Sequence, residues 1–422
     1  MTVEAHTDIA VVGAGPAGLS AALNAARSGQ TVTLIDAQPG RGGQIWRGAK
    51  VDTPHPAATL LHALDACPNV RWPGQTEIAW VEASGDDRTL ILHGPDGLTR
   101  LHTGRVILAT GAVERFLPFP GWTLPGVTGA GALQAMVKAG LDVRGARVVV
   151  AGSGPLLLAV AAGLRQAGAR VLGIAEQAPL ASAARFGLAA ARLGGKARES
   201  AGLAWALRGV GYWPGTYPVL AEGNGTLERV TLRRAGRNTT LDCEWLAVGF
   251  GLVPETRVAA LLGCALTDSG AVQVDAWGQT SVRGVYAAGE ITGVGGVDKA
   301  LHEGTVAGCA ASGQIERLRD AAATSARHSA FQAALDRAFT LRPELRELPA
   351  PHTVICRCED VTHAQLRTQA GWTDAKLQTR CGMGACQGRV CGPATEALYG
   401  WRFSGVRPPL TPLPISDLLT PP

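Results

Sequence analysis

Five of the nine cysteines lie close to the C-terminal end of the chain, in the segments ICRCEDVT and TRCGMGACQGRVCGP. They are Cys356, Cys358, Cys381, Cys386 and Cys391. Four cysteine thiolates complete the coordination of a 2Fe–2S or 4Fe–4S cluster. The grouping therefore predicts a metal site rather than a chance set of buried thiols.

Zinc is the main competitor of iron for these thiolates. Structural zinc sites usually pair cysteines at spacings from C-x2-C to C-x4-C. Cys356 and Cys358 are closer than that, although the two C-x4-C intervals between Cys381 and Cys391 fit. The other cysteines stand singly in apolar or helical surroundings and are predicted to be buried thiols: Cys67, Cys243, Cys264 and Cys309.

A nucleotide-binding signature lies at the other end of the chain. A predicted strand over residues 8–12 is followed by GAGPAG, a helix rich in Ala and Leu, and a strand over 31–35 that ends at Asp36. The glycines permit a sharp turn, the approach of backbone N–H groups to a pyrophosphate, and close packing of helix on strand. The phosphates would lie at the positive end of the helix dipole. The predicted site comprises Gly13, Gly15, Pro16, Ala17, Gly18 and Asp36.

Two further segments indicate that this dinucleotide is FAD. VILATGA, which contains Thr110 and Gly111, looks like the strand-turn of flavoproteins with two dinucleotide-binding domains. GVYAAGE, which ends in Gly289 and Glu290, resembles their late motif. The acid of that motif is more commonly Asp than the Glu290 found here. After Asp36 the chain reads GRGGQIWR, in which Gly43 and Gln44 are predicted to approach the flavin. A plain glycine loop is the alternative for that segment.

A second nucleotide fold is predicted within the first. A strand over 147–151 leads into GSGPLL, a helix, and a strand over 171–175 that ends at Glu176. Leu157 occupies the position of the third glycine, so the unit is either a site at Gly152, Gly154 and Glu176 or a structural fold without a ligand. If occupied, Glu176 favours an unphosphorylated ribose, as in NAD, ATP or ADP, over NADP.

The dithiol motifs of related flavoproteins are missing. Disulfide reductases of this fold carry CxxxxC after the second strand, and thioredoxin reductases carry CxxC in the second nucleotide domain; neither occurs here. The sequence therefore excludes a dithiol oxidoreductase. A flavin that accepts a hydride must pass its electrons to a one-electron acceptor. This requirement favours a 2Fe–2S cluster over zinc at the C-terminal cysteines.

Composition limits the remaining possibilities. The chain of 422 residues is longer than the roughly 250–300 residues that one hydrophobic core can organise, so two or three domains are expected. A net charge of +5 without long Lys/Arg runs argues against nucleic-acid binding. No signal peptide or membrane span is expected, which favours a cytoplasmic protein, with peripheral attachment at the inner membrane left open.

The predicted fold class is α/β: a Rossmann-like FAD domain with an inserted second Rossmann-like domain, plus a small C-terminal iron–sulfur domain. The predicted domains are an FAD-binding domain (1–130 and 270–318), an inserted nucleotide-binding domain (140–265), a helical linker (319–349), a 2Fe–2S domain (350–405) and a Pro-rich tail (406–422). No catalytic acid–base group is predicted. His302 with Glu303 is interpreted as a surface pair on a helix, with a position near the flavin as the alternative.

Together these segments resemble the alpha (A) subunits of bacterial heteromeric amino-acid and opine dehydrogenases, a group with D-hydroxyproline dehydrogenase, octopine and nopaline oxidase and hydrogen cyanide synthase. The resemblance rests on GAGPAGL, GGQIWR, ILATGA, AGSGPLLLA, YAAGEITGVGG and the two cysteine segments. The C-terminal part is similar to bacterioferritin-associated ferredoxin, which implies Cys356, Cys358, Cys386 and Cys391 as cluster ligands and leaves Cys381 spare. The last interval is C-x4-C here and C-x2-C in that ferredoxin.

The resemblance implies an electron-transfer subunit. A separate beta subunit of the amino-acid-oxidase type would take hydride from the C–N bond of an amino acid, imino acid or opine, for example D-hydroxyproline. This chain would pass the electrons to a downstream acceptor. The resemblance also allows a small gamma subunit and an FMN at a subunit interface. The alternatives are a stand-alone NADH-dependent reductase and a non-enzymatic nucleotide-bound scaffold with structural zinc.

Overall fold

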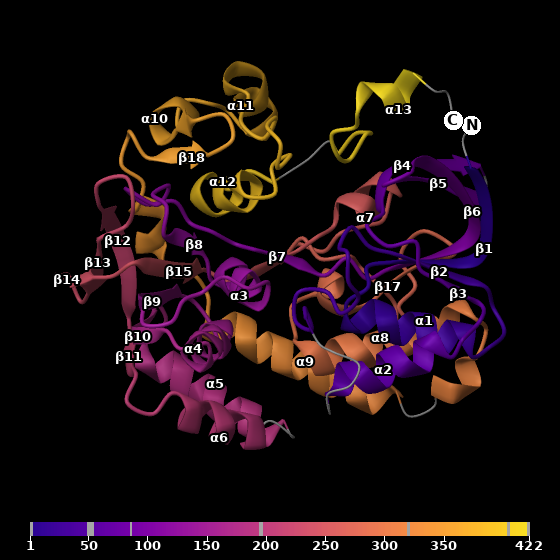
Figure 1. The fold of residues 1–422 in the computed structure, drawn as a ribbon, viewed down its shortest axis with the longest axis horizontal. Helices are drawn as coiled ribbons and strands as arrows, with labels where there is room; N and C mark the ends of the chain where they lie inside the picture. The colour runs from indigo at the N-terminus through magenta and orange to yellow at the C-terminus, as the bar shows by residue number, and fades with distance from the viewer. Residues whose placement is uncertain are drawn as a thin grey trace. The chain divides into compact units, whose positions relative to one another are not determined.

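The structure is a computed structural model, which describes residues 3–48, 55–84, 87–193, 197–318, 321–402 and 406–419. The chain forms two compact units (Figure 1). The first comprises Met1–Val113, Val253–Gln332 and Gly405–Pro422, and the second Glu114–Leu252 and Ala333–Ser404. Parts of the predicted linker (319–320), iron–sulfur domain (403–405) and tail (420–422) lie outside the described residues.

The first unit is built on a seven-stranded mixed sheet of order β3-β2-β1-β6-β5-β4, with β17 also on β6. Its strands are β1 (Val3–Val12), β2 (Val32–Ile35), β3 (Val70–Arg71), β4 (Glu77–Ser84), β5 (Asp87–Gly94), β6 (Gly97–Leu108) and β17 (Val285–Ala287). β1, β2, β3, β6 and β17 are mutually parallel, while β4 and β5 form an antiparallel extension. Runs such as Ile9–Val12 are buried on both faces, as parallel strands require.

Four of the parallel strands end in the same register. Val12 is paired with both Ile35 and Leu108, and Leu108 is paired with Ala287. The segments that follow these residues therefore leave the sheet at one edge. This is the edge at which open α/β sheets bind ligands.

Helices α1 (Pro16–Ala26), α2 (Pro56–Asp65) and α8 (Val297–Ala311) cover one face of this sheet (Figure 1). α8 packs tightly on α1, because a Cβ at Gly304 would lie 2.2 Å from the carbonyl oxygen of Ala17. The unit also contains α7 (Arg257–Leu261), α13 (Ile415–Leu419) and the 3-10 turns η1 (Gly289–Thr292) and η2 (Ile315–Leu318).

The second unit contains a five-stranded parallel sheet of order β11-β10-β9-β15-β8 and a three-stranded antiparallel sheet, β12-β13-β14. The parallel strands are β8 (Val127–Gly129), β9 (Arg147–Gly152), β10 (Arg170–Glu176), β11 (Gly211–Pro214) and β15 (Trp245–Gly249). The antiparallel strands are β12 (Thr216–Glu222), β13 (Arg229–Arg234) and β14 (Arg237–Asp242). The chain passes from one unit to the other within two short paired strands, β7 (Ala112–Glu114) and β16 (Leu252–Pro254). The helices are α3 (Ala130–Lys138), α4 (Leu156–Gln166), α5 (Leu180–Arg192) and α6 (Ala197–Ala206).

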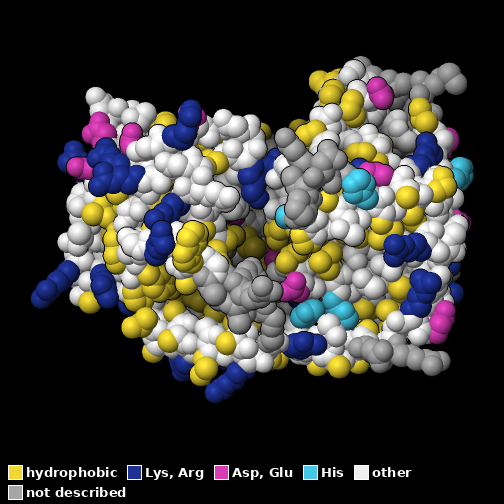
Figure 2. Space-filling model, turned by 60° about the horizontal axis from the view of Figure 1, so that its bottom comes forward, with side chains coloured by type: hydrophobic (Ala, Val, Ile, Leu, Met, Phe, Trp, Pro, Cys, Tyr) yellow, Lys and Arg dark blue, Asp and Glu magenta, His cyan; other side chains and the backbone are white. Residues whose placement is uncertain are grey.

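Helix α5 presents apolar side chains outward. Leu180 and Leu188 are exposed, whereas Phe186 is buried, and Trp205 of α6 is also exposed. Figure 2 shows hydrophobic side chains gathered at the lower left, where these helices lie. Among the helices that the structure describes, none combines the length and apolar character needed to cross a membrane.

The C-terminal part of the second unit is small and follows α9 (Ala321–Ala338). It consists of η3 (Pro343–Glu347), β18 (Val354–Cys356), β19 (Val361–Thr362), α10 (His363–Leu366), α11 (Trp372–Thr379) and α12 (Cys391–Tyr399). Three cysteines belong to its buried core, with apolar residues such as Ile355 and Trp372. A core this small usually needs a disulfide or a metal for stability.

Trp122 attaches this C-terminal part to the rest of its unit. Its indole is buried in the core of the second unit and its Nε1–H donates to the carbonyl oxygen of Val354 at 2.6 Å. Val354 lies in β18, two residues before Cys356. The bond therefore fixes the strand that carries the first cysteine.

Replacing Trp122 by Phe should lower the free energy of unfolding of the second unit by about 1–3 kcal/mol, because the partly buried carbonyl of Val354 loses its donor. Urea denaturation is the measurement, with the exposed Trp205→Phe as the matched control. Equal stability of both variants would show that the bond contributes nothing.

Candidate functional site

A pocket lies at the edge of the first sheet where the four parallel strands end. Its volume is about 240 Å³. It is lined by Gly13, Gly15, Pro16, Ala17, Asp36, Gln38, Gly43, Gln44, Ile45, Ala109, Thr110, Gly111, Ala112, Ala288, Glu290, Gly296 and Ala300. The structure thus brings together segments from four separate parts of the sequence.

Most of the residues predicted for the dinucleotide site line this pocket. Gly18 and Gly289 do not. A Cβ at Gly18 would lie 1.7 Å from the carbonyl oxygen of Gly13, and one at Gly289 would lie 2.7 Å from the Cβ of Ala17. These two glycines let α1 approach the strand and the late motif rather than face the pocket.

The N-terminus of α1 is suited to hold a diphosphate. Gly15 is its N-cap residue, no side chain caps the helix, and the first turn carries no acidic residue. The unpaired N–H groups and the helix dipole therefore favour an anion here. A Cβ at Gly15 would meet no atom closer than the Cα of Gly43, at 4.0 Å, so the glycine leaves open space between two loops. The cradle fits the pyrophosphate of FAD.

Asp36 is held in place by the loops on either side of it. Its carboxylate accepts hydrogen bonds from the backbone N–H of Ala14 at 2.7 Å and of Gln38 at 2.8 Å. It remains half-buried and lines the pocket. An acid in this position can still accept hydrogen bonds from ribose hydroxyls.

A buried lysine supports the late motif. Lys299 Nζ donates to the carbonyl oxygens of Gly289 (3.0 Å) and Gly293 (2.9 Å). It also forms a 3.0 Å ion pair with Glu303, whose carboxylate accepts the backbone N–H of Gly289 at 2.9 Å. The interpretation of Glu303 as part of a surface pair was wrong, because the bend of the chain after β17 brings residues 289–293 onto α8.

Glu290 faces the pocket from a largely buried position, and burial raises its pKa above the ordinary range. Sequence reasoning missed several lining residues, among them Gln38, Ile45, Ala288 and Ala300. Only their position next to recognised motifs could have indicated them.

The second nucleotide fold has the predicted order of strand, glycine loop, helix, strand and acid, but its acid is used differently. Glu176 is buried, and its carboxylate accepts the backbone N–H groups of Gly154 and Ala178 at 2.7 and 2.8 Å. Burial raises its pKa to about 7. Leu157 is buried between α4 and the sheet.

Residues 339–342 of the same unit lie against this glycine loop. Ser153 Oγ donates to the carbonyl oxygen of Phe339 at 3.3 Å, and a Cβ at Gly154 would lie 3.9 Å from the Phe339 ring. The side-chain amide of Gln177 donates a hydrogen bond to the carbonyl oxygen of Thr340 and accepts one from the backbone N–H of Arg342. Residues 152–154 and 176 are therefore packed against protein.

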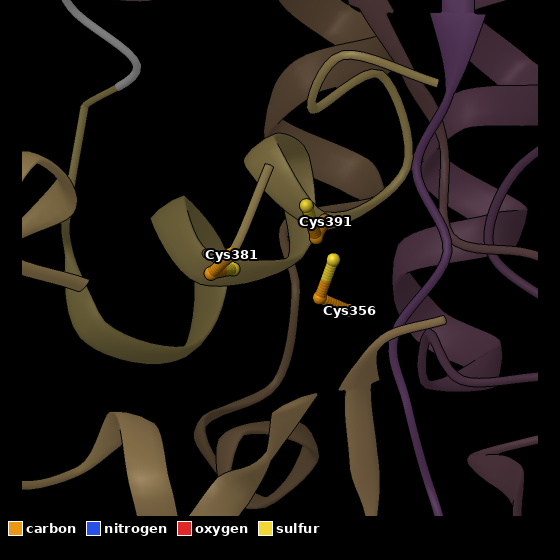
Figure 3. A group of neighbouring side chains, drawn as sticks. All are labelled: Cys356, Cys381 and Cys391. Atoms are coloured by element: carbon orange, nitrogen blue, oxygen red, sulfur yellow. The ribbon is translucent and has the colours of Figure 1, made fainter. Parts of the chain in front are cut away.

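The C-terminal cysteines converge from three elements. The sulfur atoms of Cys356, Cys381 and Cys391 all lie within 4.8 Å of one another, and all three residues are buried (Figure 3). Cys356 ends β18, Cys381 follows α11, and Cys391 begins α12. Cys386 is hydrogen-bonded to Cys391 and to the exposed Cys358, so the five thiols form one continuous group.

The thiols in this group alter one another's acidity. Hydrogen bonds from Cys381 and Cys391 lower the pKa of Cys356, and a hydrogen bond from Cys391 lowers that of Cys386. The thiolate is the form that binds metals. The donor set is all sulfur, which suits an iron–sulfur cluster or zinc.

The two nucleotide folds and the glycine-lined pocket define a flavoprotein with two dinucleotide-binding domains, as predicted. The chain belongs to the pyridine nucleotide-disulphide oxidoreductase family, whose pattern matches residues 7–308, and within it to the family of the opine oxidase A subunits. The family implies an oxidoreductase with a flavin, FAD, and the predicted family resemblance is confirmed.

Two curated relatives cover nearly the whole chain. The opine oxidase A subunit from Rhizobium meliloti (strain 1021) is 33% identical over 97% of this chain and 98% of its own length. The HcnB subunit of hydrogen cyanide synthase from Pseudomonas aeruginosa is 32% identical over 96% of this chain and 97% of its own.

Among solved structures, L-proline dehydrogenase from P. horikoshii matches with a TM-score of 0.69 at 22% identity, covering 99% of this chain and 80% of that one. Thioredoxin reductase from T. acidophilum matches with a TM-score of 0.58 at 21% identity, over 74% of this chain and 99% of that one. At these identities, the likeness establishes the fold.

Replacing Gly15 by Ala should weaken FAD binding at least about tenfold, roughly 1.4 kcal/mol, because the methyl group enters the space between the two loops. The backbone at Gly15 has φ −76°, which Ala adopts without strain, so stability should hold. FAD titration of the apoprotein by fluorescence quenching measures the effect. Gly104→Ala, where a Cβ meets nothing within 4 Å, is the control; unchanged affinity in Gly15→Ala would contradict the assignment.

The contribution of two buried carboxyl groups, Glu114 and Glu176, to the stability of the second unit should fall between pH 5 and pH 8. Burial raises the pKa of Glu114 and of Glu176 from 4.5 to about 7, so the folded state binds more protons than the unfolded state in this range. Their stabilisation is complete below about pH 4.5 and is lost as the pH rises through about 7, each carboxyl contributing on the order of a few kcal/mol.

Urea denaturation across this pH range should give a shallower slope for Glu114→Gln than for the wild type. The exposed Glu222→Gln serves as the control. An equal dependence of stability on pH in the wild type and in Glu114→Gln would contradict the expectation.

Proposed function

We propose that this chain is the electron-transfer subunit of a heteromeric dehydrogenase that oxidises an amino acid, an imino acid or an opine, for example D-hydroxyproline. The observation that carries the proposal is the presence of a five-cysteine group in the same chain as an FAD-type pocket. FAD can accept two electrons as a hydride and release them one at a time, and a 2Fe–2S cluster carries one electron at a time. The two groups together would therefore connect a hydride donor to a one-electron acceptor.

The cluster is assigned to the second unit. Its ligands are Cys356, Cys358, Cys386 and Cys391, the set that matches the ferredoxin-type pattern. All four belong to the continuous thiol group, which supports the assignment over a scatter of unrelated thiols. The buried environment around Cys356 and Cys391 keeps water from part of the site, which is one of the protein's means of tuning a cluster.

The substrate is oxidised in a separate flavoprotein subunit. The full-length relatives are named as subunits of opine oxidase and hydrogen cyanide synthase, which supports a partner. The second nucleotide fold gives no support for NADH as the source of electrons, since Glu176 is buried and residues 339–342 pack on the glycine loop. We therefore assign that fold a structural role.

Anaerobic absorbance spectra of the purified chain test this proposal. Dithionite should bleach the flavin, whereas NADH in excess should leave it oxidised, and D-hydroxyproline or an opine should reduce it only when the catalytic partner subunit is present. Full bleaching by NADH alone would overturn the proposal in favour of a stand-alone reductase. Full bleaching by the amino acid alone would place the substrate site in this chain.

A further inference from the structure

Arg47 connects two side chains that line the pocket of the first unit. One of its terminal nitrogens, Nη2, donates a hydrogen bond to Oε1 of Gln38 at 2.8 Å and another to Oε1 of Gln44 at 3.1 Å. Both glutamines line the pocket, whereas Arg47 is not among the residues that line it. The arginine therefore acts on the pocket through these two amides.

The two glutamines belong to different walls of the pocket. The backbone N–H of Gln38 is bonded to the carboxylate of Asp36, so this glutamine accompanies the acid suited to a ribose. Gln44 follows Gly43, whose Cα would lie 4.0 Å from a Cβ at Gly15, the N-cap of α1. This second glutamine therefore lies next to the cradle for a diphosphate. One guanidinium thus links the ribose wall to the diphosphate wall.

The chemistry of these bonds fixes the orientation of both amides. A guanidinium has five N–H donors and no acceptor, so each glutamine must turn its oxygen toward Arg47. The NH₂ group of each amide is then directed away from the arginine. A hydrogen bond from a cation also polarises the amide and makes its N–H groups better donors. The pyrophosphate and ribose oxygens of FAD are acceptors, which such donors suit.

The way Arg47 uses its own donors points to this role rather than to stability. Its Nε–H is buried and has no hydrogen-bond partner within the part of the chain that the structure describes. Buried donors are normally paired, so this one needs an explanation. Arg41 of the same loop, in contrast, forms a 2.6 Å ion pair with Asp65. Arg47 leaves one donor unused while a single nitrogen serves both glutamines.

The loop that carries Arg47 is held firmly against the glycine loop of the pocket. Trp46 is buried in the core of the first unit, and its backbone N–H donates to the carbonyl oxygen of Gly42 at 3.2 Å. The N–H of Gly42 donates in turn to the carbonyl oxygen of Ala14 at 2.8 Å. Gly42 has a φ of 117°, which a residue with a side chain rarely adopts. The position of Arg47 therefore follows from the turn that precedes it.

We propose that Arg47 is a positioning residue for the dinucleotide: it holds the amides of Gln38 and Gln44 so that their N–H donors serve FAD on both its ribose and its diphosphate side. The role concerns cofactor binding in the first unit. It stands apart from the electron-transfer function proposed above.

Titration of the full-length apoprotein with FAD, followed by fluorescence quenching, tests this role. Arg47→Met should bind FAD at least about tenfold more weakly than the wild type. Arg47→Lys should recover part of the loss, because one nitrogen makes both bonds and an ammonium group is also a cationic donor. Arg41→Met, which removes an arginine from the same loop, is the matched control and should bind like the wild type. Circular dichroism and urea unfolding verify that each variant is folded.

A double-mutant cycle separates this role from a purely structural one. If Arg47 acts through the amides, Arg47→Met should change FAD affinity by no more than about twofold in a Gln38→Met/Gln44→Met background. An equal loss in both backgrounds would overturn the inference, as would unchanged affinity in Arg47→Met or the absence of any recovery in Arg47→Lys. Reduction of the flavin by NADH would contradict the proposed function and leave these affinities as they are.

Discussion

The common register of β1, β2, β6 and β17 is the constraint on which the flavin-type pocket depends. Because Val12, Ile35, Leu108 and Ala287 are paired across the sheet, the four segments that follow them must meet at one edge. Packing of these strands on both faces holds the register, since a slip of one residue would exchange the side chains that fit one core cluster, such as Ile9 and Val11, with those that fit the other, such as Ala10 and Val12. The glycines at positions 13, 18 and 304 then allow loop and helices to approach the strands closely enough to shape the pocket.

The second nucleotide fold shows how the same local design can serve another purpose. In both folds the acid after the second strand accepts two backbone N–H bonds, one from the glycine loop and one from the residue two positions on. Asp36 stays half-buried beside a pocket, whereas Glu176 is buried and its loop is packed against residues 339–342. The difference accompanies the segment 339–342 that covers the second loop and to which Ser153 of that loop donates a hydrogen bond.

Local motifs were therefore predictable, and contacts between distant segments were not. The order of strand, GAGPAG, helix and Asp36 specifies its own geometry, and it correctly indicated the flavoprotein fold and the family. Nothing in the sequence near Glu303 indicated that its carboxylate would bind the N–H of Gly289, and nothing near Phe339 indicated that it would lie on Ser153. The position of Cys381 beside Cys356 likewise depends on how β18 and α11 pack, which spacing alone does not determine.

The proposed electron transfer needs two redox groups in one chain, and it depends above all on the iron–sulfur cluster. Electron paramagnetic resonance of the anaerobically purified, dithionite-reduced protein, with iron and acid-labile sulfide analysis of the same sample, tests it most directly. We expect a rhombic reduced-cluster signal together with iron and sulfide in equal amounts. A silent sample that contains zinc in place of iron would contradict it and leave a flavoprotein with a structural metal.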